Sequence, residues 1–541
     1  MLGLMQTHPL LISSLILSAE RHHGDSEIVS RRVEGDIHKC TWRDVARRSR
    51  QLAQALDSMD LKFSDRVATL AWNGYRHLEL YIGVSGSGRV LHTINPRLPP
   101  NQVAWIANHA EDQVLCFDLT FLPLIQAVHA DCKTIRKYVA LCDADRLPSD
   151  TGIPNLISYE DWINEHSNEY QWPTFDENTA SSMCYTSGTT GNPKGVLYSH
   201  RSTLLHAFAI PLPDGMNLSA SGAVLPVVPM FHVNAWGIPY SAMLTGCKLV
   251  FPGPAMDGKS IYELIESEGV TCAAGVPTVW QMLLAHVQSE DLSFSTLRKL
   301  MVGGAAVNSG MIKGFEERGA EVMQVWGMTE TSPLGTAYAP KSKHSKLTLE
   351  EQRTLRLKQG RVGFGIDMRI VGPAGEEVPW DGRTFGDLQV KGYWVLREYF
   401  KGEGSSPLDG DWFRTGDVAT IDPDGFMQIT DRTKDIIKSG GEWISSIAVE
   451  NIAMSHPDVQ MVACVGVPHP KWDERPIIVV VRRPRSDVTR EELLQLYKGT
   501  TEKWQVPDDV VFVDTIPLGA TGKILKTKLR EMLKDYVLPT A

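Results

Sequence analysis

Apolar and polar positions follow two periods along the chain, one typical of helices and one typical of buried strands. Residues 42–58 carry apolar side chains three and four positions apart, which predicts an amphipathic helix. Short apolar runs of strand length follow from residue 66 onward. These runs are residues 66–71, 113–117, 137–142, 223–229, 248–251 and 272–276. Because strand and helix patterns alternate, we expect α/β layers in which helices cover mostly parallel sheets.

The pattern changes after residue 340. Residues 341–360 are charged and rich in lysine and have no clean apolar face, so we expect a solvated excursion that is partly helical. Between residues 361 and 430, glycines separate short apolar runs such as 368–371 and 387–390. This spacing predicts a small barrel or sheet of short strands.

A run of charged and polar residues at 431–435 ends this β-rich region, and α/β texture returns after it. The predicted strands are residues 462–467 and 476–481, and the predicted helices are residues 489–496 and 527–536. Each of these helices begins with a threonine that we expect to act as its cap. We therefore expect a large domain, residues 1–431, and a small domain, residues 432–541.

Composition and charge exclude several classes of partner. The net charge is −10 and no basic stretch occurs, which argues against nucleic acid and anionic membranes as partners. The apolar run at residues 10–17 is short and broken by serine, so it predicts a packed helix, and no run approaches the ~20 residues of a membrane span. The eight cysteines contain no C-x-x-C pair, which is typical of a reducing compartment and predicts a cytoplasmic protein.

Residues 185–195 read Tyr-Thr-Ser-Gly-Thr-Thr-Gly-Asn-Pro-Lys-Gly and carry the clearest chemical signal. Glycines let backbone N–H groups face a ligand, and the hydroxyls and single ammonium suit a polyphosphate. A surface turn is the alternative interpretation. The loop is not a Walker A loop, because Lys194 is followed by Gly195 instead of serine or threonine. The candidate phosphate-binding residues are Thr186, Ser187, Gly188, Thr189, Thr190, Gly191 and Lys194.

This loop resembles the phosphate-binding signature of the adenylate-forming superfamily, which includes acyl-CoA synthetases, firefly-type luciferases and peptide-synthetase adenylation domains. Further segments resemble the superfamily's motifs in order, and the resemblance spans about residues 15–535. These segments are residues 229–237, 303–307, 324–330, 415–417, 438–445 and 519–526. The resemblance implies an N-terminal AMP-binding domain of two α/β subdomains plus a small β-barrel. It also implies a mobile α+β C-terminal domain with its hinge near Lys434.

The resemblance implies a role for each nucleotide-site residue. Adenine, ribose and phosphate contacts fall on Gly304, Ala305, Ala306, Gln324, Val325, Trp326, Gly327, Thr329, Asp417 and Arg432. Thr186 and Glu330 are the implied Mg²⁺ ligands, since a hydroxyl and a carboxylate are hard oxygen donors. Lys523 is the implied adenylation lysine, whose ammonium would neutralise charge between the carboxylate and the α-phosphate. Without the resemblance, Glu330 would be a solvated helix-start residue and Lys523 a surface lysine.

The resemblance also places the two other substrates. Lys434, Lys438, Gly440, Gly441 and Trp443 would form the hinge and the face that receives nucleotide and the pantetheine chain of CoA. Phe231, His232, Val233 and Trp236 would border the acyl channel. His232 is equally well interpreted from the residues alone as a satisfied core histidine.

The resemblance implies a two-step acyl-CoA ligase that uses Mg²⁺, ATP, CoA and a small carboxylic acid, and a homodimer, as expected for long-chain relatives. Residues 92–98 and 517–523 look like those of medium-chain and methylmercaptopropionate-CoA ligases, so the expected acid is 3-methylmercaptopropionate of dimethylsulfoniopropionate demethylation. A general medium- or long-chain fatty acid is the alternative. A luciferase-like oxygenase, a peptide-synthetase adenylation domain and a non-catalytic nucleotide sensor are the remaining rivals.

Overall fold

A computed structural model describes residues 1–541 except 187–191, 405, 441, 519–523 and 541. The chain forms two compact units, each described by itself. Unit 1 comprises Met1–Asp367 and Lys391–Phe413, and unit 2 comprises Met368–Val390 and Arg414–Ala541. The boundary expected near residue 431 falls within unit 2 and stays a prediction.

The first sheet of unit 1 is parallel except at one edge. Its order is β7-β6-β5-β3-β4-β8-β9, and only the β8–β9 pair is antiparallel among the pairs described. The strands are β3 (Arg66–Leu70), β4 (Val90–Thr93), β5 (Asp112–Phe117), β6 (Lys137–Ala140), β7 (Leu156–Ser158), β8 (Ala180–Tyr185) and β9 (Gly195–Ser199). Because β3, β4 and β8 run the same way, their carboxyl ends share one edge, and the candidate phosphate loop follows β8 at that edge.

The second sheet of unit 1 has the order β16-β15-β14-β13-β12-β10-β11-β1-β2. Its strands are β1 (Glu27–Arg31), β2 (Ile37–Thr41), β10 (Ala223–Pro226), β11 (Lys248–Phe251), β12 (Cys272–Gly275), β13 (Lys299–Val302), β14 (Glu321–Gly327), β15 (Leu334–Ala337) and β16 (Arg361–Val362). The central strands are parallel and buried, and they read as apolar runs for that reason. The alternation of helices and strands predicted from the sequence is confirmed.

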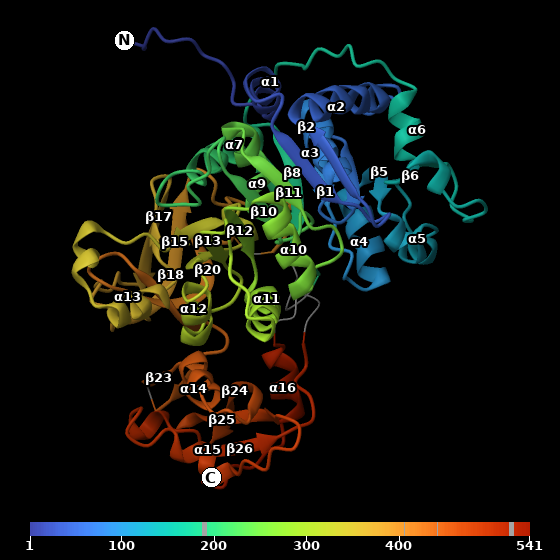
Figure 1. The fold of residues 1–541 in the computed structure, drawn as a ribbon. Helices are drawn as coiled ribbons and strands as arrows, with labels where there is room; N and C mark the ends of the chain where they lie inside the picture. The colour runs from blue at the N-terminus through green and yellow to red at the C-terminus, as the bar shows by residue number, and fades with distance from the viewer. Residues whose placement is uncertain (187–191, 405, 441, 519–523, 541) are drawn as a thin grey trace. The chain divides into compact units, whose positions relative to one another are not determined.

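Helices cover these sheets. They are α1 (Ile12–His22), α2 (Trp42–Asp57), α3 (Tyr75–Gly86), α4 (Pro100–Ala110), α5 (Leu122–Val128), α6 (Tyr159–Asn164), α7 (His200–Ala209), α8 (Val233–Trp236), α9 (Ile238–Thr245), α10 (Gly258–Glu268), α11 (Pro277–Ser289) and α12 (Ser309–Glu316). Thr41 and Asp44 form a capping box that starts α2 at the predicted position. Figure 1 shows α2 packed beside α3 and α10 beside α11.

The N-terminal apolar run forms a packed helix, as predicted, because one face of α1 is buried against α9 and α2. Within the described part of the chain, none of the helices combines the length and the apolar character that a bilayer crossing requires. All eight cysteines are free thiols, and seven of them are buried.

The charged stretch after residue 340 is partly helical, which confirms the prediction. Thr348 and Glu351 form a capping box at the start of α13 (Leu349–Arg356). Arg353 and Arg356 both pair with Glu316 of α12, so the exposed helix is held to unit 1 by charge and not by an apolar face.

The glycine-rich region forms a small sheet of order β17-β18-β20-β19, with β21 paired to β20. Its strands are β17 (Ile366–Val371), β18 (Phe385–Gly392), β19 (Leu408–Asp409), β20 (Trp412–Ile421) and β21 (Met427–Arg432). The predicted β-rich region is confirmed. The chain crosses from one unit to the other within β17, β18 and β20.

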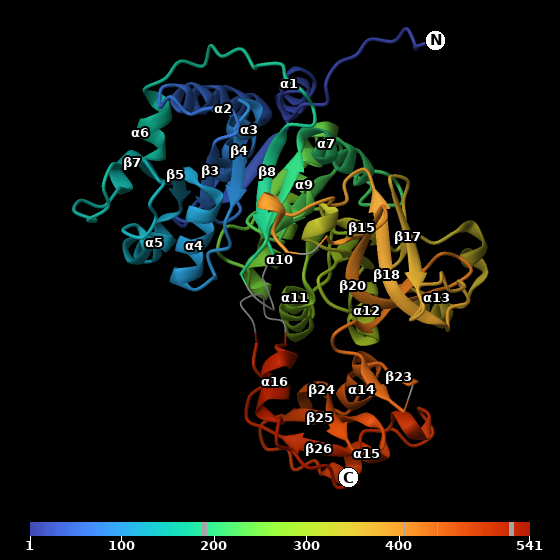
Figure 2. The same cartoon turned by 180° about the vertical axis from the view of Figure 1, so that it is seen from behind.

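The C-terminal part of unit 2 has a sheet of order β23-β22-β25-β24, with β26 paired to β25. The elements are β22 (Ile437–Ser439), β23 (Glu442–Ile444), α14 (Ser446–Met454), β24 (Val459–His469), β25 (Asp473–Arg482), α15 (Arg490–Gln495), β26 (Asp509–Phe512) and α16 (Lys526–Met532). Figure 2 shows α14, α15 and α16 around this sheet.

One of the two predicted threonine caps is wrong. Thr489 caps α15 as predicted, through a capping box with Glu492. Helix α16 instead starts at Lys526, after Leu525, and has no side-chain cap, so Thr527 lies inside its first turn. The Lys526 ammonium lies 2.7 Å from Oε1 of Glu450 and also bonds to Ser446, so a tertiary contact fixes the start of this helix.

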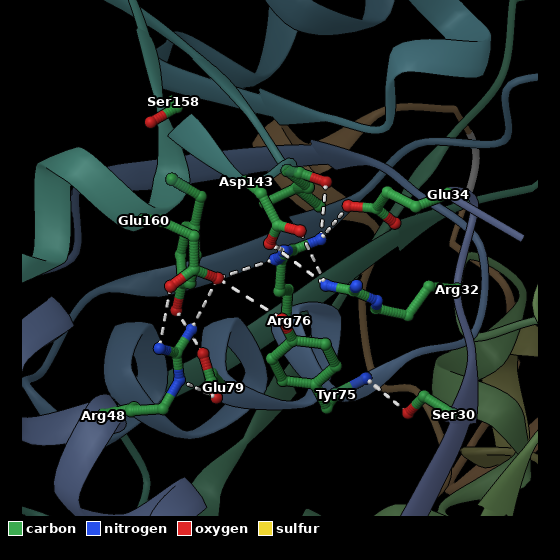
Figure 3. Close-up of polar contacts among 12 residues, drawn as sticks. Ser30, Arg32, Glu34, Arg48, Tyr75, Arg76, Glu79, Asp143, Ser158 and Glu160 are labelled. Atoms are coloured by element: carbon green, nitrogen blue, oxygen red, sulfur yellow. Dashed lines mark hydrogen bonds and ion pairs between the residues drawn. The ribbon is translucent and has the colours of Figure 1, made fainter. Parts of the chain in front are cut away.

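A buried polar cluster joins α2, α3 and α6 in unit 1 (Figure 3). Arg48 donates to both oxygens of Glu160, across 2.8 and 2.9 Å, and Arg76 Nε donates to the same carboxylate across 2.8 Å. Burial alone would raise the pKa of Glu160, but the hydrogen bonds and charges of Arg48 and Arg76 lower it to about 2. The carboxylate is therefore ionised and satisfied.

Candidate functional site

The predicted phosphate loop connects two paired strands, β8 and β9. Thr186 N–H donates to the carbonyl oxygen of Lys194 across 2.9 Å, and Lys194 N–H donates back to Oγ1 of Thr186 across 3.2 Å. These two bonds close the base of the loop. Ser187, Gly188, Thr189, Thr190 and Gly191 lie outside the described residues.

Behind the loop, Tyr185 ends a chain of polar contacts. Its hydroxyl lies 2.6 Å from Nδ1 of His109, and Nε2 of His109 lies 3.1 Å from Oε1 of Glu403. Trp105 stacks on the His109 ring at a centroid distance of 4.8 Å. Burial lowers the pKa of His109, which favours the neutral ring. The chain thus fixes the residue from which the loop departs.

The predicted metal carboxylate, Glu330, lies in the short 3₁₀ turn η3 (Thr329–Thr331) and is buried. Tyr198 of β9 donates its hydroxyl proton to the carbonyl oxygen of Thr329 across 2.8 Å. The strand that leaves the phosphate loop is therefore in contact with the turn that carries Glu330. The Glu330 carbonyl oxygen accepts a bond of 2.8 Å from Leu396 N–H.

Residues 394–404, here called the strap, contact both the loop and the Glu330 turn. The Tyr399 hydroxyl donates to Oε1 of Glu330 across 2.8 Å. The Lys194 ammonium lies over the ring of the same tyrosine, 4.7 Å from its centroid. Burial and the Glu330 carboxylate raise the pKa of Tyr399, so its hydroxyl remains a donor. Tyr399 of the strap thus contacts both Lys194 of the phosphate loop and Glu330, the candidate metal ligand.

The predicted adenine segment and one predicted acyl-channel residue also meet. Gly303 directly follows β13, and a methyl group added there would lie 2.9 Å from Cη2 of Trp236 and 2.9 Å from Cγ2 of Val325. Only glycine leaves room for the indole at this contact. Gly304, Ala305 and Ala306 follow in exposed positions, where the backbone is open to a flat ligand.

Four predicted nucleotide-site residues lie at the end of β14: Gln324, Val325, Trp326 and Gly327. Gln324 is buried, and its Oε1 has no hydrogen-bond partner among the described residues. A buried acceptor without a partner is costly unless a ligand or water satisfies it. Thr329 follows these residues in η3, and its side chain is almost fully buried.

The segment that carries the predicted acyl-channel residues has an unusual backbone. The four residues of α8 form a left-handed turn. Their φ values are 46°, 50°, 49° and 56° for Val233, Asn234, Ala235 and Trp236. Such values are rare outside glycine and cost free energy. The side chain of Asn234 holds the turn by donating to Oγ of Ser182 on β8 across 2.8 Å.

Phe231 and His232 precede that turn. Phe231 is buried, with the Trp72 ring at 6.2 Å and the Arg97 guanidinium at 5.9 Å from its ring centroid. His232 is exposed, which argues against the core-histidine alternative. Val233 and Trp236 belong to the left-handed turn that directly follows His232.

In unit 2, the two predicted ribose residues are paired. Asp417 on β20 lies opposite Arg432 on β21, and Nε of Arg432 lies 2.9 Å from Oδ1 of Asp417. Asp417 is almost fully buried, while the Arg432 side chain is partly exposed. The pair presents a fixed carboxylate and a guanidinium, which suit hydroxyl and phosphate groups respectively.

The predicted CoA face lies further along unit 2. Lys438 and Trp443 face one another on β22 and β23, and Trp443 stacks on Phe385 at a centroid distance of 5.7 Å. Gly440 has a φ of +61°, and a methyl group there would lie 2.8 Å from the Trp472 ring. Gly441 lies outside the described residues, as does Lys523. Lys434 precedes β22 and is held through its carbonyl oxygen by Arg530.

Several residues of this site carry no sequence motif. Tyr399, His109 and Glu403 support the loop across long sequence separations. Asn73 is buried, and its side-chain amide donates to the carbonyl oxygens of Pro226 and Val228, across 2.8 and 2.9 Å, in the segment that leads to Phe231. The available signal for Asn73 is the Asn-Gly pair at residues 73–74, shortly after the end of β3.

The residues present suit a hard cation. Among the described residues, no cluster of histidine, cysteine and carboxylate side chains forms a preassembled metal site. Glu330 nonetheless offers a buried carboxylate beside a tyrosine hydroxyl, and Thr186 offers a hydroxyl in the loop. One carboxylate with hydroxyl and phosphate oxygens is the donor set that Mg²⁺ prefers, so these residues fit Mg²⁺ bound together with a nucleotide.

Comparison with known proteins agrees with this arrangement. Residues 17–400 match the family model described as AMP-binding enzyme, and residues 448–523 match that of the AMP-binding enzyme C-terminal domain. The chain is 52% identical over 538 residues to 3-methylmercaptopropionyl-CoA ligase of Ruegeria lacuscaerulensis, covering 99% of each chain. It is 50% identical over 539 residues to medium-chain-fatty-acid–CoA ligase of Ectopseudomonas oleovorans, covering 99% of this chain and 98% of that one.

A solved structure has the same fold. The anthranilate CoA ligase AuaEII in complex with anthranoyl-AMP superimposes with a TM-score of 0.85 at 22% identity, covering 98% of each chain.

Proposed function

The chain belongs to the AMP-binding enzyme family, and we propose on that basis that it is an AMP-forming acyl-CoA synthetase. The observation that carries the proposal is the convergence of Lys194 and Glu330 on Tyr399. Both Lys194, the proposed phosphate-binding cation, and Glu330, the proposed metal ligand, contact this one side chain, which supports a single site for the phosphates of ATP and for Mg²⁺. Relatives named as CoA ligases, at 50–52% identity over almost the whole chain, support the same reaction class.

The reaction has two steps. The carboxylate of the acid attacks the α-phosphorus of ATP, forming acyl-adenylate and releasing pyrophosphate. The thiol of CoA then attacks the acyl carbon, forming acyl-CoA and releasing AMP. In the first step the loop residues 186–194 hold the β- and γ-phosphates, and Asp417 with Arg432 receives the ribose. Magnesium, held by Thr186 and Glu330, would neutralise phosphate charge.

We assign to Lys523 the neutralisation of the negative charge that Mg²⁺ and the loop do not cover. Its ammonium neutralises the oxygens between the acid and the α-phosphate, where negative charge builds up. After pyrophosphate leaves, residues 432–541 turn about Lys434, which withdraws Lys523 and presents the Gly440–Gly441 segment to CoA. This use of one domain for two steps is the domain closure known from other enzymes.

The acid we propose is 3-methylmercaptopropionate. The support is the 52% identity to a ligase named for that acid. The thioether sulfur would pack on the indole of Trp236, which lies beside Gly303, because sulfur–aromatic contacts are favourable. A medium- or long-chain fatty acid is the second candidate, supported by the 50% identity to a medium-chain ligase and 46% identity to a long-chain ligase.

Pyrophosphate release measured with a panel of acids from propionate to octanoate, including 3-methylmercaptopropionate, tests both parts of the proposal. The highest kcat/KM is expected with the thioether acid. A maximum at octanoate would favour the fatty-acid alternative. Light emission or oxygen uptake would identify a luciferase-like reaction, a requirement for a carrier protein in place of CoA would identify a peptide-synthetase domain, and ATP binding without turnover would identify a sensor.

We also propose a cytoplasmic homodimer. All eight thiols are free and seven are buried, which suits a reducing compartment. Dimerisation is carried over from long-chain relatives, and light scattering of the purified protein at working concentration decides between a monomer and a dimer.

A further inference from the structure

The strap, residues 394–404, contacts Lys194 and Gly195 at the end of the phosphate loop and also the end of α4. Lys401 donates to the carbonyl oxygen of His109 across 2.9 Å and pairs with Glu111 at 2.7 Å. A methyl group on Gly195, the residue after Lys194, would lie 3.0 Å from Cβ of Phe400. The strap is therefore packed on the first residue of β9 and bonded to the end of α4.

The same segment is bonded to the turn that carries Glu330. Ser332 donates its hydroxyl proton to the carbonyl oxygen of Trp394 across 2.8 Å. The indole N–H of Trp394 donates to the carbonyl oxygen of Leu334, also across 2.8 Å. Together with the bond from Leu396 N–H to Glu330, these contacts fix the Glu330 backbone from the strap side.

Tyr399 is the strap residue that touches the charged groups themselves. Its hydroxyl donates to the carboxylate of Glu330, and its ring face receives the ammonium of Lys194. Two different parts of the Tyr399 side chain therefore contact groups of opposite charge: the hydroxyl contacts a carboxylate and the ring contacts an ammonium. A hydroxyl proton suits an anion, while the electron-rich ring face suits a cation.

Room for this arrangement is built into the strap. A methyl group on Gly404, whose φ is +84°, would lie 2.7 Å from Nζ of Lys194. The ammonium therefore has glycine on one side and the tyrosine ring on another. Neither of these two neighbours brings a negative charge to the Lys194 ammonium.

We propose that Tyr399 is a positioning residue that orients Glu330 for the metal and holds Lys194 beside it for the phosphates. This rests on the proposed function, because both residues act on MgATP. The hydroxyl holds one oxygen of the Glu330 carboxylate in a fixed position. The ring keeps Lys194 from folding onto the carboxylate, which would neutralise both groups.

Two substitutions separate the two parts of this role. Tyr399→Phe keeps the ring and removes the hydroxyl, so it should raise the Mg²⁺ concentration for half-maximal ATP binding by about tenfold, as loss of an outer-shell partner does. At saturating Mg²⁺, ATP affinity should be close to wild type. Tyr399→Leu removes the ring as well, so ATP affinity should fall even at saturating Mg²⁺. Calorimetric titration of ATP at several Mg²⁺ concentrations measures both effects without turnover.

Two controls test whether Tyr399 acts through Glu330. In a Glu330→Gln background, Tyr399→Phe should have no further effect on the Mg²⁺ requirement, because the carboxylate that it orients is absent. Tyr262→Phe removes a hydroxyl that donates to the carbonyl oxygen of Ser293, outside the proposed site, and should leave the Mg²⁺ requirement unchanged.

The outcomes distinguish this proposal from the proposed function. A Tyr399→Phe protein with a lower melting temperature but the wild-type Mg²⁺ requirement has lost only a structural contact, and the positioning role is then overturned. Additive effects in the Glu330→Gln background would overturn it as well. If the wild-type chain itself releases no pyrophosphate with any acid, the proposed function fails independently of Tyr399.

Discussion

Nη2 of Arg530 donates a hydrogen bond to the carbonyl oxygen of Lys434 across 3.1 Å. The same nitrogen lies 2.6 Å from Oδ1 of Asp435. Arg530 belongs to α16, which begins at Lys526, shortly after Lys523 in the sequence. The helix that follows the proposed adenylation lysine is thus bonded to the proposed hinge.

We predict that Arg530→Met slows the first half-reaction by about fivefold, the equivalent of a net hydrogen bond worth ~1 kcal/mol. Without the contact, the helix that follows Lys523 in the sequence loses its bonds to residues 434–435. Single-turnover pyrophosphate release measures this step, and thioester formation from supplied acyl-adenylate should stay near wild type. Arg490→Met removes another arginine–carboxylate pair of unit 2 and serves as control. Equal slowing of both steps would argue against the assignment.

Lys523→Ala should abolish pyrophosphate release while acyl-CoA still forms from supplied acyl-adenylate. The ammonium is needed where charge builds up on the α-phosphate and not in the attack by CoA. Rapid-quench measurement of each half-reaction tests this. Lys528→Ala, which lies in α16 itself, provides the matched control. Loss of both half-reactions to the same extent would remove Lys523 from the specific role given to it.

Gly303→Ala should lower kcat/KM for the acid by at least about fivefold, because forcing a methyl group into a packed contact costs ~1–3 kcal/mol. The clash is with Trp236 and Val325. In a Trp236→Ala background, the same change should cost less, since the indole has gone and only the contact with Val325 remains. Gly74→Ala, where an added methyl group meets nothing within 4 Å, should leave the kinetics unchanged. Equal losses with and without the indole would disprove the contact as the cause.

The free energy of unfolding should depend on pH through Glu160. Its pKa in the folded protein is about 2, below its ordinary 4.5, so the folded state binds the proton less tightly than the unfolded state. Its contribution is complete above pH 4.5 and is lost as the pH falls toward 2. Glu160→Gln should cost about 3 kcal/mol at neutral pH, because Arg48 and Arg76 lose their shared partner.

Denaturant unfolding at a series of pH values tests this expectation. The stability difference between wild type and Glu160→Gln should shrink as the pH falls below 4.5. The exposed Glu165 at the end of the same helix gives the control, Glu165→Gln, with little change in stability at any pH. A difference that stays constant down to pH 2 would show that the ion pairs do not set the pH dependence.

Periodicity and caps predicted the elements because they are local. The start of α2 follows from Thr41 and Asp44, which bond to each other's backbone. The start of α16 could not be predicted this way, because Lys526 forms an ion pair with Glu450 and a hydrogen bond with Ser446, which are distant in the sequence. The phosphate loop was visible because its glycines and hydroxyls are consecutive.

Contacts across long separations left no signal in the sequence. Tyr399 and Glu330 are 69 residues apart, and Tyr399 belongs to no glycine-rich or paired-acid pattern. The left-handed turn at Val233–Trp236 runs against local preference, because a β-branched valine disfavours positive φ. Its conformation depends on Asn234 reaching Ser182 on another element.

The strap also defines how far the chain can be dissected. Lys401 and Glu111 are 290 residues apart, yet they pair in the same unit. A fragment that stopped before Trp394 would retain the phosphate loop and the turn that carries Glu330, but it would lack the strap, which contacts both. A fragment meant to keep the loop, the Glu330 turn and the strap together must therefore extend at least through Gly404, and split-protein designs should place their breakpoint beyond that residue.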